Sequence, residues 1–138
     1  AGDLVVFAAF TGLRLSEMFH VVKRPMIANE AIMLTTTKNG RPRMIPLHPR
    51  ALNIAQKMPF AYSQSRLRTQ WEQARIKSGL EHIHWHDLRH TFASWLIQRG
   101  VALHVLKDLL GHKTLQMTMR YAHLVTDNLR AAVNLLED

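Results

Sequence analysis

The sequence contains no cysteine among its 138 residues. Disulfides, thiolate nucleophiles and cysteine-held metal ions are therefore excluded, and a metal would have to be held by histidine and carboxylate side chains alone. No uncharged apolar run reaches the roughly 18 residues that predict a membrane-spanning helix. The opening "AGDLVVFAAF" also lacks the basic start of a signal peptide. We therefore expect a protein of the cytoplasm with no membrane partner.

Acidic residues are also scarce, with 10 Asp and Glu against 18 Lys and Arg, a formal net charge of +8 and a pI near 10.6. This imbalance predicts a polyanionic partner, although charge alone does not distinguish nucleic acid from an anionic membrane surface. With 47% hydrophobic residues, the chain is long enough for one core and too short for two. We expect a single domain over residues 1–138, and the missing initiator methionine predicts a fragment of a longer protein.

Capping residues and apolar spacing predict a mainly helical domain with one small antiparallel sheet, an α+β fold. The predicted helices cover residues 3–10, 16–22, 49–57, 63–78, 87–99, 102–110, 114–121 and 126–136. The stretches "IMLTTT" (Ile32–Thr37) and "PRMIPL" (Pro42–Leu47) read as two strands, and Asn39-Gly40 between them suits a tight hairpin turn. Lys38 would then lie at the tip of this hairpin, while residues 25–30 carry too weak a pattern to predict an element.

Four histidines fall within nine residues in "HIHWHDLRH". On a strand, His82, His84 and His86 would point to one side and could bind zinc, so a metal-dependent nuclease is one candidate function. Asp87, however, favours the start of a helix, and apolar residues follow it at helical spacing. A helix that begins at His86 or Asp87 destroys this geometry, so we predict no metal site and keep the nuclease as an alternative.

In the helical arrangement, His86, Arg89 and His90 share one face at the N-terminus of the helix. Helix N-termini carry partial positive charge and free N–H groups, so this face suits an anion such as phosphate. A solvated basic face would explain the same residues, and this helix alone leaves both interpretations open.

Three further residues stand out by their local context. Arg14 in "TGLRLSE" lies on a glycine-bearing turn among apolar residues, where a buried arginine needs an anionic partner; an exposed pair with Glu17 would also account for it. "LLGH" places His112 just after a glycine that ends a helix, and "MRYAHL" places Tyr121 on the next helix. Taken singly, a loop histidine and a core tyrosine explain these two residues.

Five stretches follow one another along the chain: "TGLRLSE", "TKNGRPRMIPL", "HDLRHTFASWL", "LLGH" and "RYAHL". In this order, they resemble the catalytic domain of the tyrosine recombinases, the phage integrase family. The resemblance runs from about Leu4 to Leu124, with the tyrosine nine positions after the histidine of "LLGH". It implies the fold of the DNA breaking-rejoining enzymes. The catalytic set that it implies is complete: Arg14, Lys38, His86, Arg89, His112 and Tyr121. This complete set favours a phosphate site over a solvated basic face.

The activity that the resemblance implies is site-specific DNA recombination, as in an integrase of a phage or another mobile element. Tyr121 would attack a phosphodiester of double-stranded DNA to leave a 3′-phosphotyrosine and a free 5′-hydroxyl, while Arg14 and Arg89 would hold the non-bridging oxygens. Because the covalent link stores the energy of the phosphodiester, no metal, ATP or other cofactor is expected.

The other implied roles concern protons and hydrogen bonds. His86 is predicted to accept the tyrosine proton, because an imidazole titrates near neutral pH. Lys38 is predicted to protonate the departing 5′-oxygen, and His112 to donate a hydrogen bond to the phosphate. Glu17 is expected to orient the arginine region, and His90 to make a structural hydrogen bond.

Further DNA contacts are expected from basic side chains outside the catalytic set, chiefly to phosphates. These residues are Arg41, Arg43, Arg66, Arg68, Arg75 and Lys77. A solubilising surface charge is the alternative explanation for each of them.

The resemblance also implies partners for the complete protein. Family members carry N-terminal core-binding or arm-binding DNA domains, which we expect to be missing from this chain. The complete enzyme is expected to act as a tetramer on DNA in the cytoplasm, as a bacterial or phage-encoded protein. The final helix has Leu129, Ala132, Val133 and Leu136 on one side, which would suit either its own domain or a neighbouring subunit. A non-catalytic DNA-binding relic of the same scaffold remains an alternative; a type IB topoisomerase matches the motifs less closely.

Overall fold

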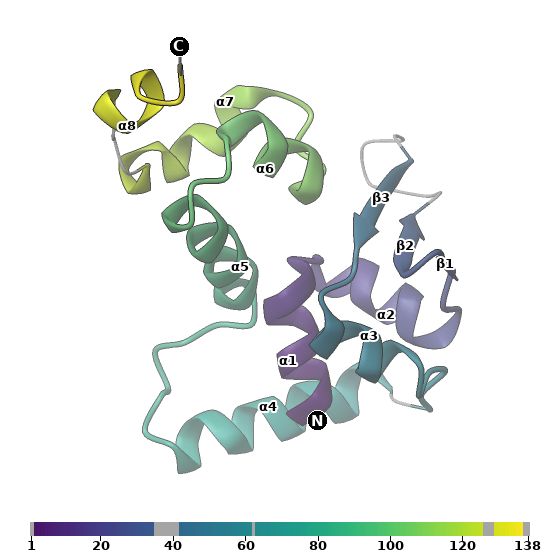
Figure 1. Cartoon of the computed structure of the whole chain (residues 1–138). Helices are drawn as coiled ribbons and strands as arrows, with labels where there is room; N and C mark the ends of the chain where they lie inside the picture. Colours follow the sequence, from purple (N-terminus) through teal and green to yellow (C-terminus); the bar gives the residue numbers. More distant parts are fainter. Residues whose placement is uncertain (1, 35–41, 62, 126–128, 137–138) are drawn as a thin grey trace.

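The computed structural model describes residues 2–34, 42–61, 63–125 and 129–136, which form mostly helices with one small sheet (Figure 1). In chain order, the elements are α1 (Gly2–Thr11), α2 (Leu15–Lys23), β1 (Ile27–Ala28), β2 (Ala31–Leu34), β3 (Arg43–Pro46), α3 (Pro49–Ala55), α4 (Gln64–Lys77), α5 (His86–Gln98), α6 (Leu103–Leu110), α7 (Leu115–Thr118), the 3₁₀ helix η1 (Met119–Leu124) and α8 (Leu129–Val133). The predicted α+β fold is confirmed. Lys38 and Arg41, together with the expected hairpin turn, lie outside the described residues.

Most helix boundaries follow local signals in the sequence. The Ser63 hydroxyl accepts the backbone N–H of Arg66 at 3.1 Å and so caps the start of α4. Pro49 opens α3, where a missing backbone N–H costs nothing. Gly111 ends α6 with a φ of 71°, in the left-handed region that glycine adopts without strain.

The helix predicted over residues 114–121 has a different form. The α-helix α7 stops at Thr118, and the chain continues as the 3₁₀ helix η1, which carries Tyr121. A 3₁₀ helix has about three residues per turn instead of about 3.6, so it directs Tyr121 differently from a continued α-helix.

The sheet is antiparallel with the strand order β1-β2-β3. Ile32 of β2 lies opposite Ile45 of β3, and both are buried, whereas the next pair, Met33 and Met44, is exposed. This alternation is what a sheet with one face on the core requires. The sequence does not predict β1, because two residues are too few for an alternating pattern.

The buried side chains form two clusters that α5 joins. The larger cluster lies between α1, α2, the sheet, α3 and the start of α4. The smaller one contains Phe92, Ala93, Ile97, Leu106, Leu110 and Tyr121. Leu88, near the start of α5, packs on the larger cluster, and α5 lies between α1 and the group of α6, α7 and η1 (Figure 1).

The N-terminal helices α1 and α2 belong to the core. Leu4, Phe7, Met18 and Val21 from these two helices are buried in the larger cluster. Among the described residues, no single helix is long and apolar enough to cross a membrane; α1 and α2 reach that length and apolarity only together, across a bend of 116°.

The helices α4 and α8 bury little apolar surface. Of the residues of α4, Leu67 is buried and Ile76 is exposed. Val133 in α8 is 65% exposed, and Leu136 just after it is 83% exposed. These two side chains of the C-terminal segment are therefore largely exposed.

Candidate functional site

One cavity, of about 420 Å³, collects most of the predicted catalytic residues. It is lined by the turn before α2, the first half of α5, the connection between α6 and α7, and the segment from α7 into η1. Its lining side chains are Arg14, His86, Arg89, His112, Gln116, Met117, Arg120 and Tyr121. Five of the six predicted catalytic residues therefore meet in one place, and the sixth, Lys38, lies outside the described residues.

Arg89 is a buried cation, with 4% of the residue exposed. Its guanidinium donates to the Gly12 carbonyl at 2.5 Å and to the Leu110 carbonyl at 2.7 Å, so it joins the end of α1 to the end of α6. Burial, followed by the charge of Arg14, lowers the pKa of Arg89 to about 10, and the side chain stays charged at neutral pH. A guanidinium has five N–H donors, which leaves donors for a phosphate in the cavity.

The turn between α1 and α2 positions Arg14 and Arg89. Gly12 has a φ of +67°, and a Cβ at this position would collide with the ring of Phe92, so both the backbone and the space require glycine. The Gly12 carbonyl accepts from Arg89, and Arg14 lies two residues later, at the N-terminal cap of α2. One short turn thus brings two guanidinium groups to the same cavity.

Arg43 is held inside the protein by Glu17. Its guanidinium binds both carboxylate oxygens, at 2.6 and 3.0 Å, and its Nε donates to the Leu109 carbonyl at 3.3 Å. Each side chain of the pair is 7% exposed. The same carboxylate accepts the backbone N–H of Arg14 at 2.9 Å, so it links β3 to the turn that carries this arginine. This arrangement argues against the predicted DNA contact of Arg43, because the side chain is already paired and covered.

The charge of Glu17 depends on Arg43. Burial alone would raise the pKa of this carboxyl group, but the hydrogen bonds and charge of Arg43, with a smaller effect of Arg14, bring the pKa below its ordinary value. Glu17 is therefore ionised at neutral pH, and the buried pair carries no net charge.

Glu17→Gln is expected to lower the free energy of unfolding by roughly 3 to 5 kcal/mol at pH 7, because it leaves the Arg43 guanidinium buried without its counter-ion. The stabilisation from the carboxylate is present above its unfolded-state pKa and is lost as the pH falls through its lower folded-state pKa. The difference between wild type and variant in urea unfolding should therefore shrink in acid.

Glu72→Gln provides the matched control for this prediction. Glu72 pairs with Arg75, but its side chain is 53% exposed. Exposed pairs contribute little, so we expect a change below about 1 kcal/mol. Equal losses in the two variants would contradict the structural importance of the Glu17–Arg43 pair.

His112 is a neutral side chain with one ring nitrogen already engaged. Its Nδ1 lies 2.7 Å from the hydroxyl of Thr118, a fully buried residue of α7. Burial, followed by the charges of Arg89 and Arg14, lowers the pKa of His112 to about 4. If the Thr118 hydroxyl donates to Nδ1, the ring hydrogen lies on Nε2, which can then donate to a bound phosphate.

Tyr121 is 5% exposed, and its hydroxyl oxygen lies 2.5 Å from Nδ1 of His90. His86 lines the same cavity, but among the described side chains it is His90 that holds this hydroxyl. The rings of His86 and His90 stand edge to face, with their centroids 4.8 Å apart. The hydrogen bond expected for His90 is thus present, and its partner is the predicted nucleophile.

Arg120 is a cavity residue that the sequence does not single out. It lines the same cavity as Tyr121 and brings a further positive charge to it. Burial raises the pKa of this phenol, and the charges of Arg120 and Arg89 offset part of that increase. The available signal in the sequence is its position directly before the tyrosine in "MRYAHL".

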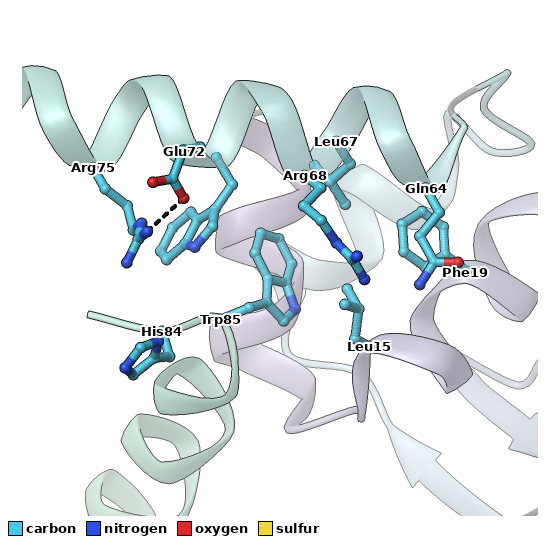
Figure 2. Close-up of a pocket in the computed structure, with 10 residues that line it drawn as sticks. Leu15, Phe19, Gln64, Leu67, Arg68, Glu72, Arg75, His84 and Trp85 are labelled. Atoms are coloured by element: carbon cyan, nitrogen blue, oxygen red, sulfur yellow. Dashed lines mark hydrogen bonds and ion pairs between the residues drawn. The ribbon is translucent and has the colours of Figure 1, made fainter. Parts of the chain in front are cut away.

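The basic residues predicted to contact DNA from α4 have different surroundings. Arg75 pairs with Glu72 (Figure 2). It also donates to the carbonyls of Glu81 at 2.7 Å and Ile83 at 2.8 Å, so it fastens the segment after α4. This engagement argues against a DNA contact by Arg75. The exposed basic side chains of α4 are Arg66, Arg68 and Lys77.

The clustered histidines separate into different environments. His86 is the first residue of α5 and faces the cavity, whereas His84 borders a second pocket, beneath α4 (Figure 2). Asp87 accepts the backbone N–H of His84 at 2.8 Å, which closes the turn into α5. Within the ranges that the structure describes, no three His, Asp or Glu side chains converge as metal ligands. The geometry therefore gives the metal-dependent alternative no support.

The sequence is similar to those of phage integrases. The model of the phage integrase family matches residues 61–127. The integrase of Haemophilus phage HP1 is 32% identical over 135 residues, which cover 96% of this chain and 40% of that protein. The integrase of Salmonella phage P22 is 46% identical over 61 residues, or 44% of this chain and 16% of that protein. The chain thus spans less than half the length of these curated relatives.

Solved structures share the fold. The catalytic domain of bacteriophage HP1 integrase matches with a TM-score of 0.79 and 31% identity, over 96% of this chain and 80% of that one. The XerH site-specific recombinase, in a post-cleavage complex with a palindromic difH substrate, matches with a TM-score of 0.70 and 23% identity, over 99% of this chain and 45% of that one. The arrangement of helices around the three-stranded sheet is therefore that of a known class of catalytic domain.

Proposed function

Because the chain belongs to the phage integrase family of tyrosine recombinases, we propose that it is the catalytic domain of an integrase, a site-specific recombinase that cleaves and rejoins double-stranded DNA. The family resemblance of the sequence motifs is confirmed. The observation that carries the proposed activity is the single cavity shared by Arg14, Arg89, His112 and Tyr121. Guanidinium and imidazole donors around a nucleophilic hydroxyl are what phosphoryl transfer requires.

Tyr121 is the nucleophile in this proposal. Its oxygen forms a bond to the phosphorus, the bond from phosphorus to the 5′-oxygen breaks, and a 3′-phosphotyrosine results. Arg14 and Arg89 hold the non-bridging oxygens and stabilise the additional charge of the transition state, while His112 donates to the same group. The covalent link keeps the energy of the phosphodiester, so rejoining consumes no ATP and needs no metal ion.

Two protons must move during cleavage. Lys38 is the proposed donor to the departing 5′-oxygen. The tyrosine proton passes to a neutral imidazole, and His86 and His90 both lie beside the nucleophile. Burial, reinforced by nearby positive charges, lowers the pKa of each of these histidines, which keeps both rings neutral at physiological pH.

The proposed partners are double-stranded DNA and other copies of the complete protein. Exposed Arg66, Arg68 and Lys77 on α4, with Arg41, would contact DNA phosphates. N-terminal DNA-binding domains of the complete recombinase would close around the duplex, and four subunits would act together on DNA. The exposed Val133 and Leu136 would then pack on a neighbouring subunit.

Covalent trapping on DNA tests the proposed function. We expect the protein to form an SDS-resistant adduct with at least one nicked suicide duplex from a set that tiles the DNA flanking its gene. The nick lets the short 5′-hydroxyl fragment diffuse away, so the phosphotyrosine cannot be resealed. Adduct yield should be unchanged by EDTA or by omission of ATP.

The alternatives give different results in the same assay. A DNA-binding relic would shift the duplexes on a native gel and form no adduct with any of them. A metal-dependent nuclease would cut the duplexes only until EDTA is added. A type IB topoisomerase would relax plasmids that carry none of the flanking DNA. Each of these results would contradict the proposal.

A further inference from the structure

The hydroxyl of the predicted nucleophile is already held by a histidine. His90 lies on α5 directly after the phosphate-binding candidate Arg89, and its Nδ1 is 2.5 Å from the Tyr121 oxygen across 31 positions of sequence. The two rings are 5.8 Å apart between centroids, with an interplanar angle of 51°. The hydrogen bond therefore fixes the position of the reacting oxygen from a rigid helix.

The hydroxyl of Tyr121 can donate this hydrogen bond. Burial raises the pKa of the phenol, so the oxygen carries its hydrogen at neutral pH. A neutral imidazole with its hydrogen on Nε2 presents Nδ1 as the acceptor of that hydrogen. This arrangement requires a neutral His90 ring with its hydrogen on Nε2.

The surroundings of His90 keep its ring neutral. Burial lowers the pKa of His90, and the charges of Arg120 and Arg89 lower it further, while Asp87 opposes them. The other titratable group that faces the ring from α5 is His86, which stands edge to face against it. At pH 7, His90 is therefore an imidazole that can accept a proton.

The tyrosine, by contrast, keeps its proton until it reacts. Burial raises the pKa of the Tyr121 phenol despite the offsetting charges of Arg120 and Arg89. A phenol ordinarily titrates near pH 10, so spontaneous ionisation at pH 7 is rare. A proton acceptor in contact with the oxygen removes this barrier as the bond to phosphorus forms.

We propose that His90 is a further catalytic residue of this site, which accepts the Tyr121 proton on Nδ1 as the phenol oxygen attacks the phosphodiester. The O–H bond of the tyrosine breaks while the bond from oxygen to phosphorus forms, and the electron pair of the breaking P–O bond leaves with the 5′-oxygen. On rejoining, His90 returns the proton to the tyrosine. His86, which touches the His90 ring and lines the cavity, is left to face the phosphate. This inference rests on the proposed recombinase activity.

The test is single-turnover cleavage between pH 5 and 9 on a suicide duplex that wild type cleaves, with sulfur in place of the bridging 5′-oxygen. Sulfur leaves as a thiolate without a proton, so the need for a proton donor is removed and the need for an acceptor remains. The wild-type rate should be constant above neutrality and fall in acid as His90 becomes protonated. Because the pKa of His90 is lowered, this fall should lie below pH 6.5.

His90→Asn and His86→Asn form the matched pair of variants. In His90→Asn, the introduced amide occupies the place of Nδ1 and keeps a hydrogen bond to the tyrosine, but it does not titrate. We expect His90→Asn to cleave about 10² to 10⁴ times more slowly at pH 8 and to lose the fall in acid. His86→Asn should keep the fall in acid. Thermal unfolding and DNA affinity of both variants should match wild type, which separates the effect from misfolding.

Several outcomes would overturn the inference. Wild-type rates in His90→Asn would show that His90 is not needed, while slow cleavage with an unchanged pH profile would show a purely structural role. If the cleavage rate no longer falls in acid in His86→Asn, but still falls in His90→Asn, then His86 is the residue that accepts the proton. In each of these cases wild type still forms the adduct, so the proposed function stands; if wild type forms no adduct on any duplex, the proposed function fails and the inference fails with it.

Discussion

Tyr121→Phe is expected to abolish the covalent complex with suicide DNA while leaving the fold and DNA binding intact. The substitution removes the attacking oxygen, for which no other group in the cavity can substitute. The phenylalanine ring of the variant would keep the packing of the smaller core cluster, where the tyrosine ring contributes its apolar surface. SDS gels of the suicide reaction measure the adduct, and fluorescence anisotropy with the same duplex measures binding.

The chain offers a matched control for this variant. Tyr62, which lies outside the described residues, is the other tyrosine of the sequence. Tyr62→Phe is expected to form the adduct at the wild-type rate. An adduct in Tyr121→Phe, or its loss in Tyr62→Phe, would show that the nucleophile has been assigned to the wrong residue.

Arg89→Met is expected to cause two losses that can be measured separately. In cleavage, removal of a donor to the charged transition state should cost about 10² to 10³ in rate. In folding, the carbonyls of Gly12 and Leu110 lose their buried donor, which should lower the free energy of unfolding by roughly 2 to 4 kcal/mol. The lowered pKa of Arg89 shows that burial and neighbouring cations disfavour its charge, which offsets part of this second loss.

Two further variants separate these effects. Arg89→Lys keeps a positive charge but cannot reach two carbonyls and a phosphate at once, so it should recover little of either loss. Arg99→Met removes an exposed arginine just after the other end of α5 and should change stability by less than about 0.5 kcal/mol. Urea unfolding and single-turnover cleavage measure the two quantities. Wild-type cleavage by folded Arg89→Met would exclude this residue from the phosphate site.

Local features of the sequence were sufficient for most of the secondary structure. Ser63, Pro49 and Gly111 mark helix boundaries by properties of a few adjacent residues, and the structure uses each of them in that way. The helical register that starts at His86 likewise follows from Asp87 and the apolar spacing after it. Strand β1 was not predicted, because its two residues pair with β2 and carry no alternating pattern of their own.

The ordered motifs also determined the family and nominated the residues of the site, five of which share one cavity. The position of a basic residue in the sequence could not show which partner its side chain binds. Arg43 and Arg75 look like their neighbours Arg41 and Arg68 in the sequence, yet the structure pairs Arg43 with Glu17 and Arg75 with backbone carbonyls. Whether a cation is free for DNA depends on which acceptors the fold brings to it.

What the sequence alone determined is therefore most of the helices, the basic character and the family with its candidate chemistry, because these depend on neighbouring residues and on order along the chain. The tertiary structure decided the partners. Arg89 reaches Gly12 across 77 positions, and Tyr121 meets His90 across 31. Contacts at such separations arise when distant elements pack around a shared core, and no local pattern encodes them.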